Sequence, residues 1–229
     1  MGSSSSPKLV LTNDGSHTLY TKKYDEHYHS IHGSIGESKH VFIQSGYRWY
    51  INRNPSVEDI LVFEVGLGTG LNALLTLVES ATLNVSTNYT SIEAFPISNE
   101  LIASLNFIER LALSDYEAAF NAIHKCEWSK LNKITPTFAL AKLLYKLEDI
   151  TLEQKYHVIY FDAFAPDKQP EMWQEDIFIA MYKALLNGGC LVTYCAKGVV
   201  KRRLKGVGFR IESIPGPPGK REMTRAVKD

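Results

Sequence analysis

A glycine-rich loop and an acidic residue at a fixed separation predict a site for an adenosine-containing cofactor. Gly66, Gly68 and Gly70 come directly after the apolar segment 60–65. Glycines in such a loop let the backbone turn sharply and approach a ligand where a Cβ would clash. Glu93 closes the next strand candidate, 89–93, and lies 23 residues after Gly70, close to the roughly 20 residues expected before a ribose-binding carboxylate. The combination favours nucleotide binding over an ordinary tight turn and a solvent-exposed strand end.

The loop differs from the fingerprint of dinucleotide-binding proteins, G-x-G-x-x-G, because Leu71 stands where the third glycine belongs. Its three alternating glycines, preceded by the acidic Glu64, resemble motif I of class I methyltransferases. The resemblance implies a Rossmann-like fold with S-adenosylmethionine as the cofactor.

Asp162 is the candidate for the reacting site. It closes the apolar segment 156–162, and the aromatic Phe164 follows two positions later. This order is similar to the [DN]-P-P-[YF] motif of methyltransferases that act on amino groups, with Ala163 and Ala165 in place of the prolines. The alternative role for Asp162 is a helix cap or turn residue.

The chemistry of methyl transfer limits what Asp162 can do. A sulfonium donor requires a neutral amine, and a primary alkylamine has a pKa near ~10.4, so neutrality costs roughly 4–5 kcal/mol. An ionised carboxylate beside the amine stabilises the ammonium and opposes this step. We therefore expect Asp162 to orient the amine and relay its proton, and apolar walls such as Phe164 and Trp173 to lower the pKa of the amine.

Alternating strand and helix patterns predict the scaffold that brings these residues together. Short apolar segments separated by helical patterns indicate an α/β fold with a mostly parallel, doubly wound sheet and ligands at the carboxyl ends of its strands. We expect strands at 60–65, 89–93, 156–162, 190–195, 208–214 and 222–227, and helices at 71–78, 98–110, 171–186 and 197–205. The segment 138–147 suits either a strand or a helix.

A small β-rich elaboration is predicted before the main domain. The segments 9–12 and 18–20 flank an Asn-Asp-Gly-Ser turn cluster, which indicates a hairpin, and 41–43 is a further strand candidate. We therefore divide the chain into an elaboration at 1–55 and one methyltransferase domain at 56–229.

The composition is typical of a globular cytoplasmic protein. Hydrophobic residues make up 45% of the 229 residues, and no apolar run approaches the ~18 residues that would predict a membrane span. The cysteines form no C-x-x-C pattern, so we expect buried thiols at Cys126, Cys190 and Cys195. No metal is expected, because no carboxylate or cysteine set completes a site around the clustered histidines His27, His29 and His32.

The net charge is zero, but the end of the chain is basic. Residues 197–229 contain ten Lys or Arg against three Asp or Glu, so they carry +7 and the remainder −7. This polarity indicates an edge for an anionic partner, or else a solvated helix with a charged terminus. The residues expected to contact RNA phosphates are Lys197, Lys201, Arg202, Arg203 and Lys205. Tyr47, Trp49 and Tyr50 suit base stacking or, as the commoner role, core packing.

The segment 161–173, FDAFAPDKQPEMW, resembles the signature of the MnmC-like tRNA methyltransferases. Further matches occur in the same order at 37–42, 66–72, 92–96 and 219–223. The resemblance implies methylation of the amine of 5-aminomethyl-2-thiouridine at the tRNA wobble position, giving the 5-methylaminomethyl product. Bifunctional members also carry a flavin-dependent oxidase domain, whereas this chain resembles the stand-alone form, so no flavin is expected.

Residue by residue, the resemblance implies a catalytic role for Asp162 and two further sets of contacts. The cofactor set is Glu64, Gly66, Gly68, Gly70, Asn72, Glu93, Phe95, Asp149 and Asp162, with Asp149 placed against the adenine amino group. The substrate set is Phe164, Pro166, Trp173, Lys220, Arg221 and Glu222, the last three near the reacting site or the RNA.

Two alternatives from other classes stay open. An aminopropyltransferase similar to spermidine synthase also places an aspartate at a strand end. Its polyamine site should be rich in carboxylates, whereas Lys168 and a basic tail follow Asp162 here. A non-catalytic module that binds adenosyl nucleotides or RNA is disfavoured by the intact motif around Asp162.

Overall fold

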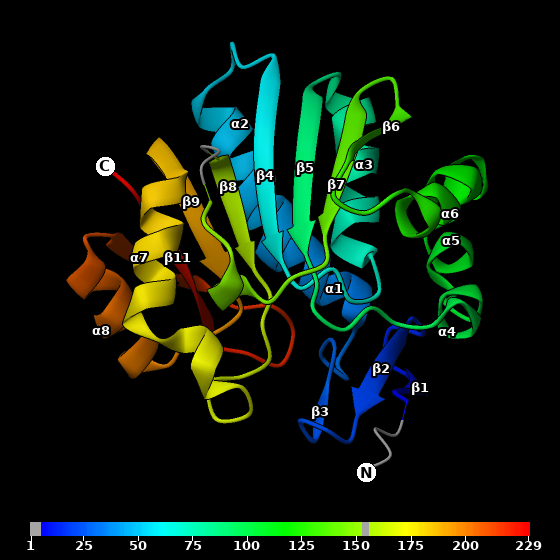
Figure 1. Ribbon diagram of the computed structural model, residues 1–229, viewed down its shortest axis with the longest axis horizontal. Helices are drawn as coiled ribbons and strands as arrows, with labels where there is room; N and C mark the ends of the chain where they lie inside the picture. The colour runs from blue at the N-terminus through cyan, green and yellow to red at the C-terminus, as the bar shows by residue number, and fades with distance from the viewer. Residues whose placement is uncertain (1–5, 153–155) are drawn as a thin grey trace.

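An eight-stranded sheet forms the centre of the protein in a computed structural model that describes residues 6–152 and 156–229 (Figure 1). Its strands are β4 (Asp59–Val65), β5 (Ser86–Ile92), β6 (Leu131–Thr135), β7 (Phe138–Leu143), β8 (Tyr156–Phe161), β9 (Leu185–Thr193), β10 (Arg210–Pro215) and β11 (Glu222–Val227). They lie in the order β10-β11-β9-β8-β4-β5-β7-β6. The strands from β9 to β7 pair in parallel, and antiparallel strands complete both edges.

Helical segments connect the strands. They are α1 (Ser34–Ser38), η1 (Lys39–Arg48), α2 (Trp49–Arg53), α3 (Leu71–Leu83), α4 (Asn99–Ala103), α5 (Phe107–Arg110), η2 (Ser114–Tyr116), α6 (Glu117–Lys125), η3 (Leu147–Asp149), η4 (Pro170–Trp173), α7 (Glu175–Ala184) and α8 (Gly198–Val207).

Strand β4 stands where the order of the parallel strands reverses. From β4 the sheet continues to β5 and β7 in one direction and to β8 and β9 in the other. At such a switch point the loops after neighbouring strands diverge and leave a crevice outside the carboxyl ends. The predicted α/β fold with a mostly parallel, doubly wound sheet is therefore confirmed.

Helices cover both faces of the sheet because successive residues of a strand point to opposite sides. Val62 and Val158 lie in one core, with residues of η1 and α3. Phe63 and Ile159 lie in the other, with residues of α7 and α8. All four side chains are fully buried. Burial on both faces favours apolar residues, which explains the nearly continuous apolar runs of β4 and β8.

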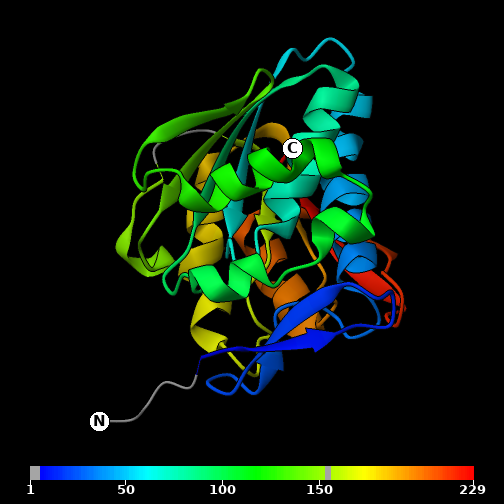
Figure 2. The ribbon, with the colours of Figure 1, turned by 90° about the vertical axis from the view of Figure 1, so that its right-hand side faces the viewer.

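A second, three-stranded sheet lies beyond the carboxyl ends of the central strands (Figures 1 and 2). It consists of β1 (Lys8–Leu11), β2 (His17–Thr21) and β3 (Glu26–His27). β1 and β2 pair antiparallel with Lys8 opposite Tyr20, so the predicted hairpin is confirmed.

The strand predicted at 41–43 is wrong. Val41, Phe42 and Ile43 belong to η1, which continues α1 and leads into α2, and all three side chains are buried. η1 packs between α3 and the strands β8 and β9. A short apolar run fits a buried helix as well as a strand. Three residues are too few to show the hydrophobic periodicity that distinguishes the two.

Tyr47 and Tyr50 are buried, as core packing requires. The Tyr47 hydroxyl lies 2.7 Å from Thr87 Oγ1, and Trp49 stacks with the Arg225 guanidinium 4.4 Å from its ring centre. The core-packing interpretation of this aromatic cluster is confirmed.

Two predicted helices are interrupted. The helix expected at 98–110 is divided into α4 and α5, and Asn106 between them donates to the Gly15 carbonyl and accepts from the His17 N–H, both at 2.9 Å. The break therefore joins this region to the small sheet. The helix expected at 171–186 is divided into η4 and α7, and its last two residues already belong to β9.

Cys190 and Cys195 are buried free thiols, as predicted, whereas Cys126 is only partly buried. Across 6–152 and 156–229, no helix is long and apolar enough to cross a membrane. In the same ranges, no three His, Cys, Asp or Glu side chains come together as ligands for a metal.

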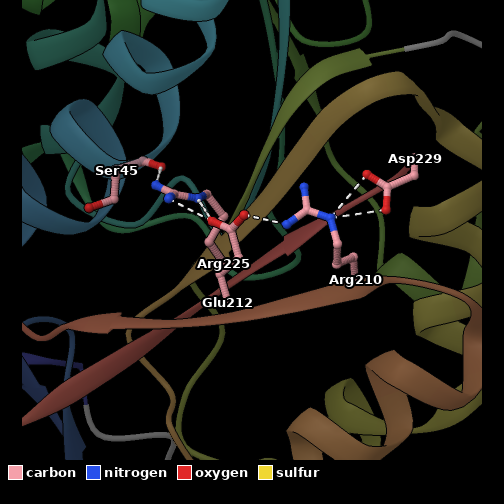
Figure 3. Close-up of polar contacts among 5 residues, drawn as sticks. All are labelled: Ser45, Arg210, Glu212, Arg225 and Asp229. Carbon is pink, nitrogen blue, oxygen red and sulfur yellow. Dashed lines mark hydrogen bonds and ion pairs between the residues drawn. The ribbon is translucent and has the colours of Figure 1, made fainter.

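Ion pairs hold the antiparallel edge of the sheet together (Figure 3). Arg225 on β11 donates to Glu212 on β10 (2.7 Å) and to the Ser45 carbonyl in η1 (3.1 Å). Arg210 bridges Glu212 (2.5 Å) and Asp229 (3.0 Å). Only 12% of the Arg225 side chain is exposed, so its pair is the least screened by solvent. The network fixes the β10–β11 hairpin, whose turn reaches the candidate site.

Candidate active site

A cavity of about 660 Å³ lies between the carboxyl ends of the central strands and the small sheet. Its volume is within the range of about 300–1,000 Å³ that small-molecule sites occupy. Tyr24 and Tyr28 from the small sheet form part of its wall. Seven of the residues predicted from the sequence also line it: Gly66, Gly68, Asn72, Glu93, Phe95, Asp162 and Phe164.

The loop after β4 requires glycine for its torsion angles and for its close contacts. Gly66 has a φ of 90°, and a Cβ there would lie 3.2 Å from the Asp162 carbonyl oxygen. Gly68 has a φ of 49°, and its N–H donates to Glu93 Oε2 at 3.0 Å. Residues with a side chain rarely adopt such φ values. The loop backbone thus lies against the ends of β8 and β5, where Asp162 and Glu93 are located.

Backbone N–H groups hold Glu93 in place. One carboxylate oxygen accepts from Gly68, and the other accepts from the Phe95 N–H at 2.7 Å. Burial raises the pKa of Glu93, and these backbone donors oppose the rise. A carboxylate oxygen can accept more than one hydrogen bond, so Glu93 can still accept from a pair of neighbouring hydroxyls in the cavity.

Asp162 follows β8 and lies next to the loop. Asn72, in the first turn of α3, donates from Nδ2 to Asp162 Oδ2 at 2.9 Å. Burial raises the pKa of Asp162 to about 7, and the nearby Glu37 carboxylate adds to the rise. The Asn72 hydrogen bond and the Lys220 ammonium act in the opposite direction. Asp162 is therefore a carboxyl group that exchanges a proton near neutral pH.

An ion pair between a buried carboxylate and a half-buried ammonium lies on the other side of Asp162. Lys220 donates to Glu37 Oε1 at 2.9 Å, and its ammonium lies 3.9 Å from the centre of the Tyr194 ring. The Tyr194 hydroxyl donates to the Ala163 carbonyl at 2.9 Å. Only 8% of the Glu37 side chain is exposed. The pair thereby joins α1 to the turn before β11, directly beside the segment that follows β8.

A family model described as S-adenosyl-L-methionine-dependent methyltransferase matches residues 108–229, which is more than half of the chain. The chain belongs to this family. The cofactor predicted from the glycine loop is therefore confirmed.

Curated relatives of this methyltransferase carry the name "tRNA 5-methylaminomethyl-2-thiouridine biosynthesis bifunctional protein MnmC". The protein from Cupriavidus metallidurans is 31% identical over 95% of this chain and 33% of its own length. The protein from Idiomarina loihiensis is 34% identical over 87% of this chain and 35% of its own length. The chain thus spans about a third of the length of these relatives.

The crystal structure of MnmC2 from Aquifex aeolicus resembles the methyltransferase with a TM-score of 0.81. The alignment covers 99% of this chain and 71% of that chain, at 24% sequence identity. The similarity confirms the predicted class I methyltransferase fold.

The donor set of the cavity fits S-adenosylmethionine. Glu93 has acceptor capacity for the two ribose hydroxyls, and Gly66 and Gly68 bring backbone without a side chain to the cavity wall. At the adenine end, Leu147 and Glu148 line the cavity. Asp149, which the sequence analysis placed against adenine, lies outside the lining, one residue farther along η3.

Three other predicted residues lie behind the cavity wall. Glu64 is fully buried, accepts from Ser91 Oγ at 2.7 Å, and has a pKa raised to about 8 by burial. Gly70 lies against the ring of His124. Trp173 is fully buried and donates from Nε1 to the Phe164 carbonyl at 2.7 Å, so it positions the wall formed by Phe164 without lining the cavity itself.

Phe164 packs against residues that sequence analysis missed. Its ring lies 4.8 Å from that of Tyr24 and 5.3 Å from that of Tyr28. Nothing in the local sequence marks these tyrosines, because they precede Phe164 by more than 130 residues. Tyr194 was missed as well, although its place directly after β9 at the same edge of the sheet was a usable signal.

The remaining predicted substrate residues line a second cavity of about 330 Å³. Pro166, Lys220, Arg221 and Glu222 are among its walls. The structure therefore distributes the predicted substrate set over two neighbouring cavities, with Phe164 in the first and the basic residues in the second.

Proposed function

We propose that this methyltransferase transfers a methyl group to the amine of 5-aminomethyl-2-thiouridine at the tRNA wobble position. The observation that carries the proposal is the environment of Asp162. This carboxyl group has a pKa raised to about 7 and lies where the cofactor loop and the first turn of α3 meet the end of β8. The names of the curated relatives, which specify biosynthesis of 5-methylaminomethyl-2-thiouridine in tRNA, supply the substrate. A tRNA substrate would place the reaction in the cytoplasm.

The raised pKa suits Asp162 to receive the proton of the incoming ammonium. Transfer from an ammonium of pKa ~10.4 to an ordinary aspartate costs roughly 9 kcal/mol. Transfer to a carboxyl of pKa about 7 costs roughly half as much. Asn72 holds Oδ2, so Oδ1 is the oxygen left for the amine. Asp162 would therefore both orient the amine and relay its proton, as the sequence analysis expected.

When bound, S-adenosylmethionine supplies a methyl group on a sulfonium. Glu93 and the glycine loop would hold this cofactor and Asp162 the amine, so that the amine lone pair would form the C–N bond as the C–S electron pair returns to sulfur. The chain contributes orientation, since holding two reactants in line is worth several kcal/mol. Phe164, whose ring contacts those of Tyr24 and Tyr28, supplies an apolar wall on this side of the cavity.

The test is transfer of labelled methyl from S-adenosylmethionine to tRNA from cells that accumulate the unmethylated aminomethyl uridine. We expect incorporation into this tRNA and none into fully modified tRNA or free polyamines. Label in polyamines but not in tRNA would contradict the proposal and favour a small-amine transferase.

A further inference from the structure

The turn between β10 and β11 carries two cations, Lys220 and Arg221, and both line the second cavity. Lys220 is bound to Glu37 and stacked on Tyr194. Arg221 is exposed, and its guanidinium makes no hydrogen bond or ion pair with residues 6–152 or 156–229. The Arg225 network shown in Figure 3 fixes the hairpin that holds both residues. The Lys220 ammonium is thus already held by Glu37 and Tyr194, whereas the exposed Arg221 guanidinium is available to a ligand.

Arg221 lines the second cavity, on the far side of the segment that follows Asp162. Along this segment, Ala163 and Phe164 line the cofactor cavity, and Ala165 and Pro166 line the second one. The second cavity therefore adjoins the reacting side at the carboxyl ends of β8 and β9. A nucleotide whose base reaches Asp162 can therefore extend past this segment and present its phosphates to the second cavity.

The second cavity presents more positive than negative charge to such a nucleotide. The one carboxylate among its described lining residues, Glu222, is bound to Lys201 at 2.9 Å and also attracts the Arg221 guanidinium. Lys197 pairs with Asp167 at 2.5 Å, but about half of each side chain or more is exposed. An exposed pair of this kind contributes about 1 kcal/mol or less, so a phosphate can replace Asp167 at small cost.

The basic helix α8 is less available to RNA than its sequence indicates. Lys201 is bound to Ser213 Oγ and Glu222, and Arg203 donates to the Trp173 carbonyl at 2.7 Å. These two residues hold α8 against the hairpin and η4. Arg202 and Lys205 are exposed but lie outside the second cavity, so Lys197 is the one of the five predicted phosphate contacts that lines it.

We propose that the second cavity is a phosphodiester subsite, in which Arg221 and Lys197 bind the RNA backbone beside the nucleotide that carries the reacting amine. The proposal rests on the proposed function. A guanidinium can hold a phosphate through two parallel hydrogen bonds, which fixes orientation as well as charge. The subsite selects a polynucleotide over a free nucleoside or polyamine, because only a polynucleotide places a phosphate there.

The test compares Arg221→Gln with the matched surface variant Arg202→Gln in methylation of tRNA at several salt concentrations. We expect Arg221→Gln to raise the KM for tRNA about tenfold and to reduce the slope of log(kcat/KM) against log[salt] by about one. The kcat at saturating tRNA and the Kd for S-adenosylmethionine should stay unchanged. Arg202→Gln should change KM less than twofold, and Arg221→Lys should retain the salt slope while KM rises severalfold.

The outcomes separate the subsite from the reaction. If the wild-type enzyme methylates tRNA but Arg221→Gln keeps both its KM and its salt slope, the subsite is wrong and the proposed function stands. Equal losses in Arg221→Gln and Arg202→Gln would show a diffuse basic surface and also overturn the subsite. If the wild-type enzyme methylates no tRNA, the proposed function fails, and the subsite fails with it.

Discussion

Most of the predicted cofactor contacts come from one stretch of the chain, whereas the substrate side is assembled from distant segments. Residues 64–95 supply the glycine loop, Asn72, Glu93 and Phe95. On the substrate side, Glu37 and Lys220 meet across 183 positions, with Asp162 and Tyr194 beside them. The cofactor side uses backbone geometry that a βαβ unit provides by itself, while the substrate side depends on tertiary packing. The two sides should therefore respond differently to substitution.

The largest expected effect separates the two sides by chemistry. Asp162→Asn removes the proton acceptor but keeps the shape, so we expect kcat to fall by about 10²–10⁴. The Kd for S-adenosylmethionine should change little, since Glu93 and the glycine loop remain. Single-turnover methylation and cofactor titration measure the two quantities. Asp115→Asn, in η2 and outside both cavities, is the control and should leave both unchanged. If Asp162→Asn weakened S-adenosylmethionine binding as much as it lowered kcat, the cofactor side and the substrate side would not be separable.

The second prediction tests the backbone basis of the cofactor side. Gly66→Ala places a Cβ at a φ of 90°, 3.2 Å from the Asp162 carbonyl oxygen. We expect a stability cost of about 1–2 kcal/mol from the torsion angle and a weaker Kd for S-adenosylmethionine by about tenfold or more. Thermal unfolding and cofactor titration measure these effects. Gly206→Ala, in α8 with open space around it, is the control and should be neutral or stabilising.

The same contrast explains what sequence reasoning could reach. The parallel strands, the glycine loop and Glu93 were predictable because each depends on a local pattern whose spacing is set by one βαβ unit. The path of η1 was not, because three buried apolar residues fit a strand or a helix equally well. Tyr24 and Tyr28 were not, since only the docking of the small sheet brings them to Phe164.

The sequence also could not show which basic side chains are free to bind a ligand. The sequence shows a basic segment, but only the structure shows that Lys201 and Arg203 are used internally while Arg221 is left for a ligand. Likewise, the register of η3 decides whether Glu148 or its neighbour Asp149 lines the cavity, and composition carries no information on this.

A third prediction concerns Glu64, which lies beneath the cofactor loop. Burial raises its pKa to about 8, so the folded protein binds the proton more tightly than the unfolded chain does. Stability should therefore decrease as the pH rises from the unfolded pKa to about 8, by a few kcal/mol at most. Glu64→Gln removes the ionisable carboxyl, so the free energy of unfolding of this variant should fall less over the same pH range. Denaturant unfolding between pH 5 and pH 9 measures it.

The control for Glu64→Gln is Glu117→Gln, an exposed position at the start of α6. It should leave the wild-type pH dependence of stability unchanged. Identical curves for wild type and Glu64→Gln would show that Glu64 is not the titrating group.

The smallest expected effect lies on the substrate side, where the ion pair of Glu37 and Lys220 adjusts the pKa of Asp162. The Glu37 carboxylate raises this pKa and the Lys220 ammonium lowers it. Because kcat/KM requires ionised Asp162 in the free enzyme, its profile should rise with pH and break near pH 7. Glu37→Gln should move the break to lower pH and Lys220→Met to higher pH, each by on the order of one pH unit.

Opposite shifts from one ion pair are the decisive signature, because a general loosening of the site would lower activity at every pH without moving the break. Arg48 and Glu79 form a comparable pair (2.6 Å) outside the lining of either cavity. Glu79→Gln should therefore leave the break in place. Shifts of the same sign in Glu37→Gln and Lys220→Met would mean that the pair acts on Asp162 through packing and not through its charges. The two sides of the site would then differ only in how far apart their residues lie in the sequence.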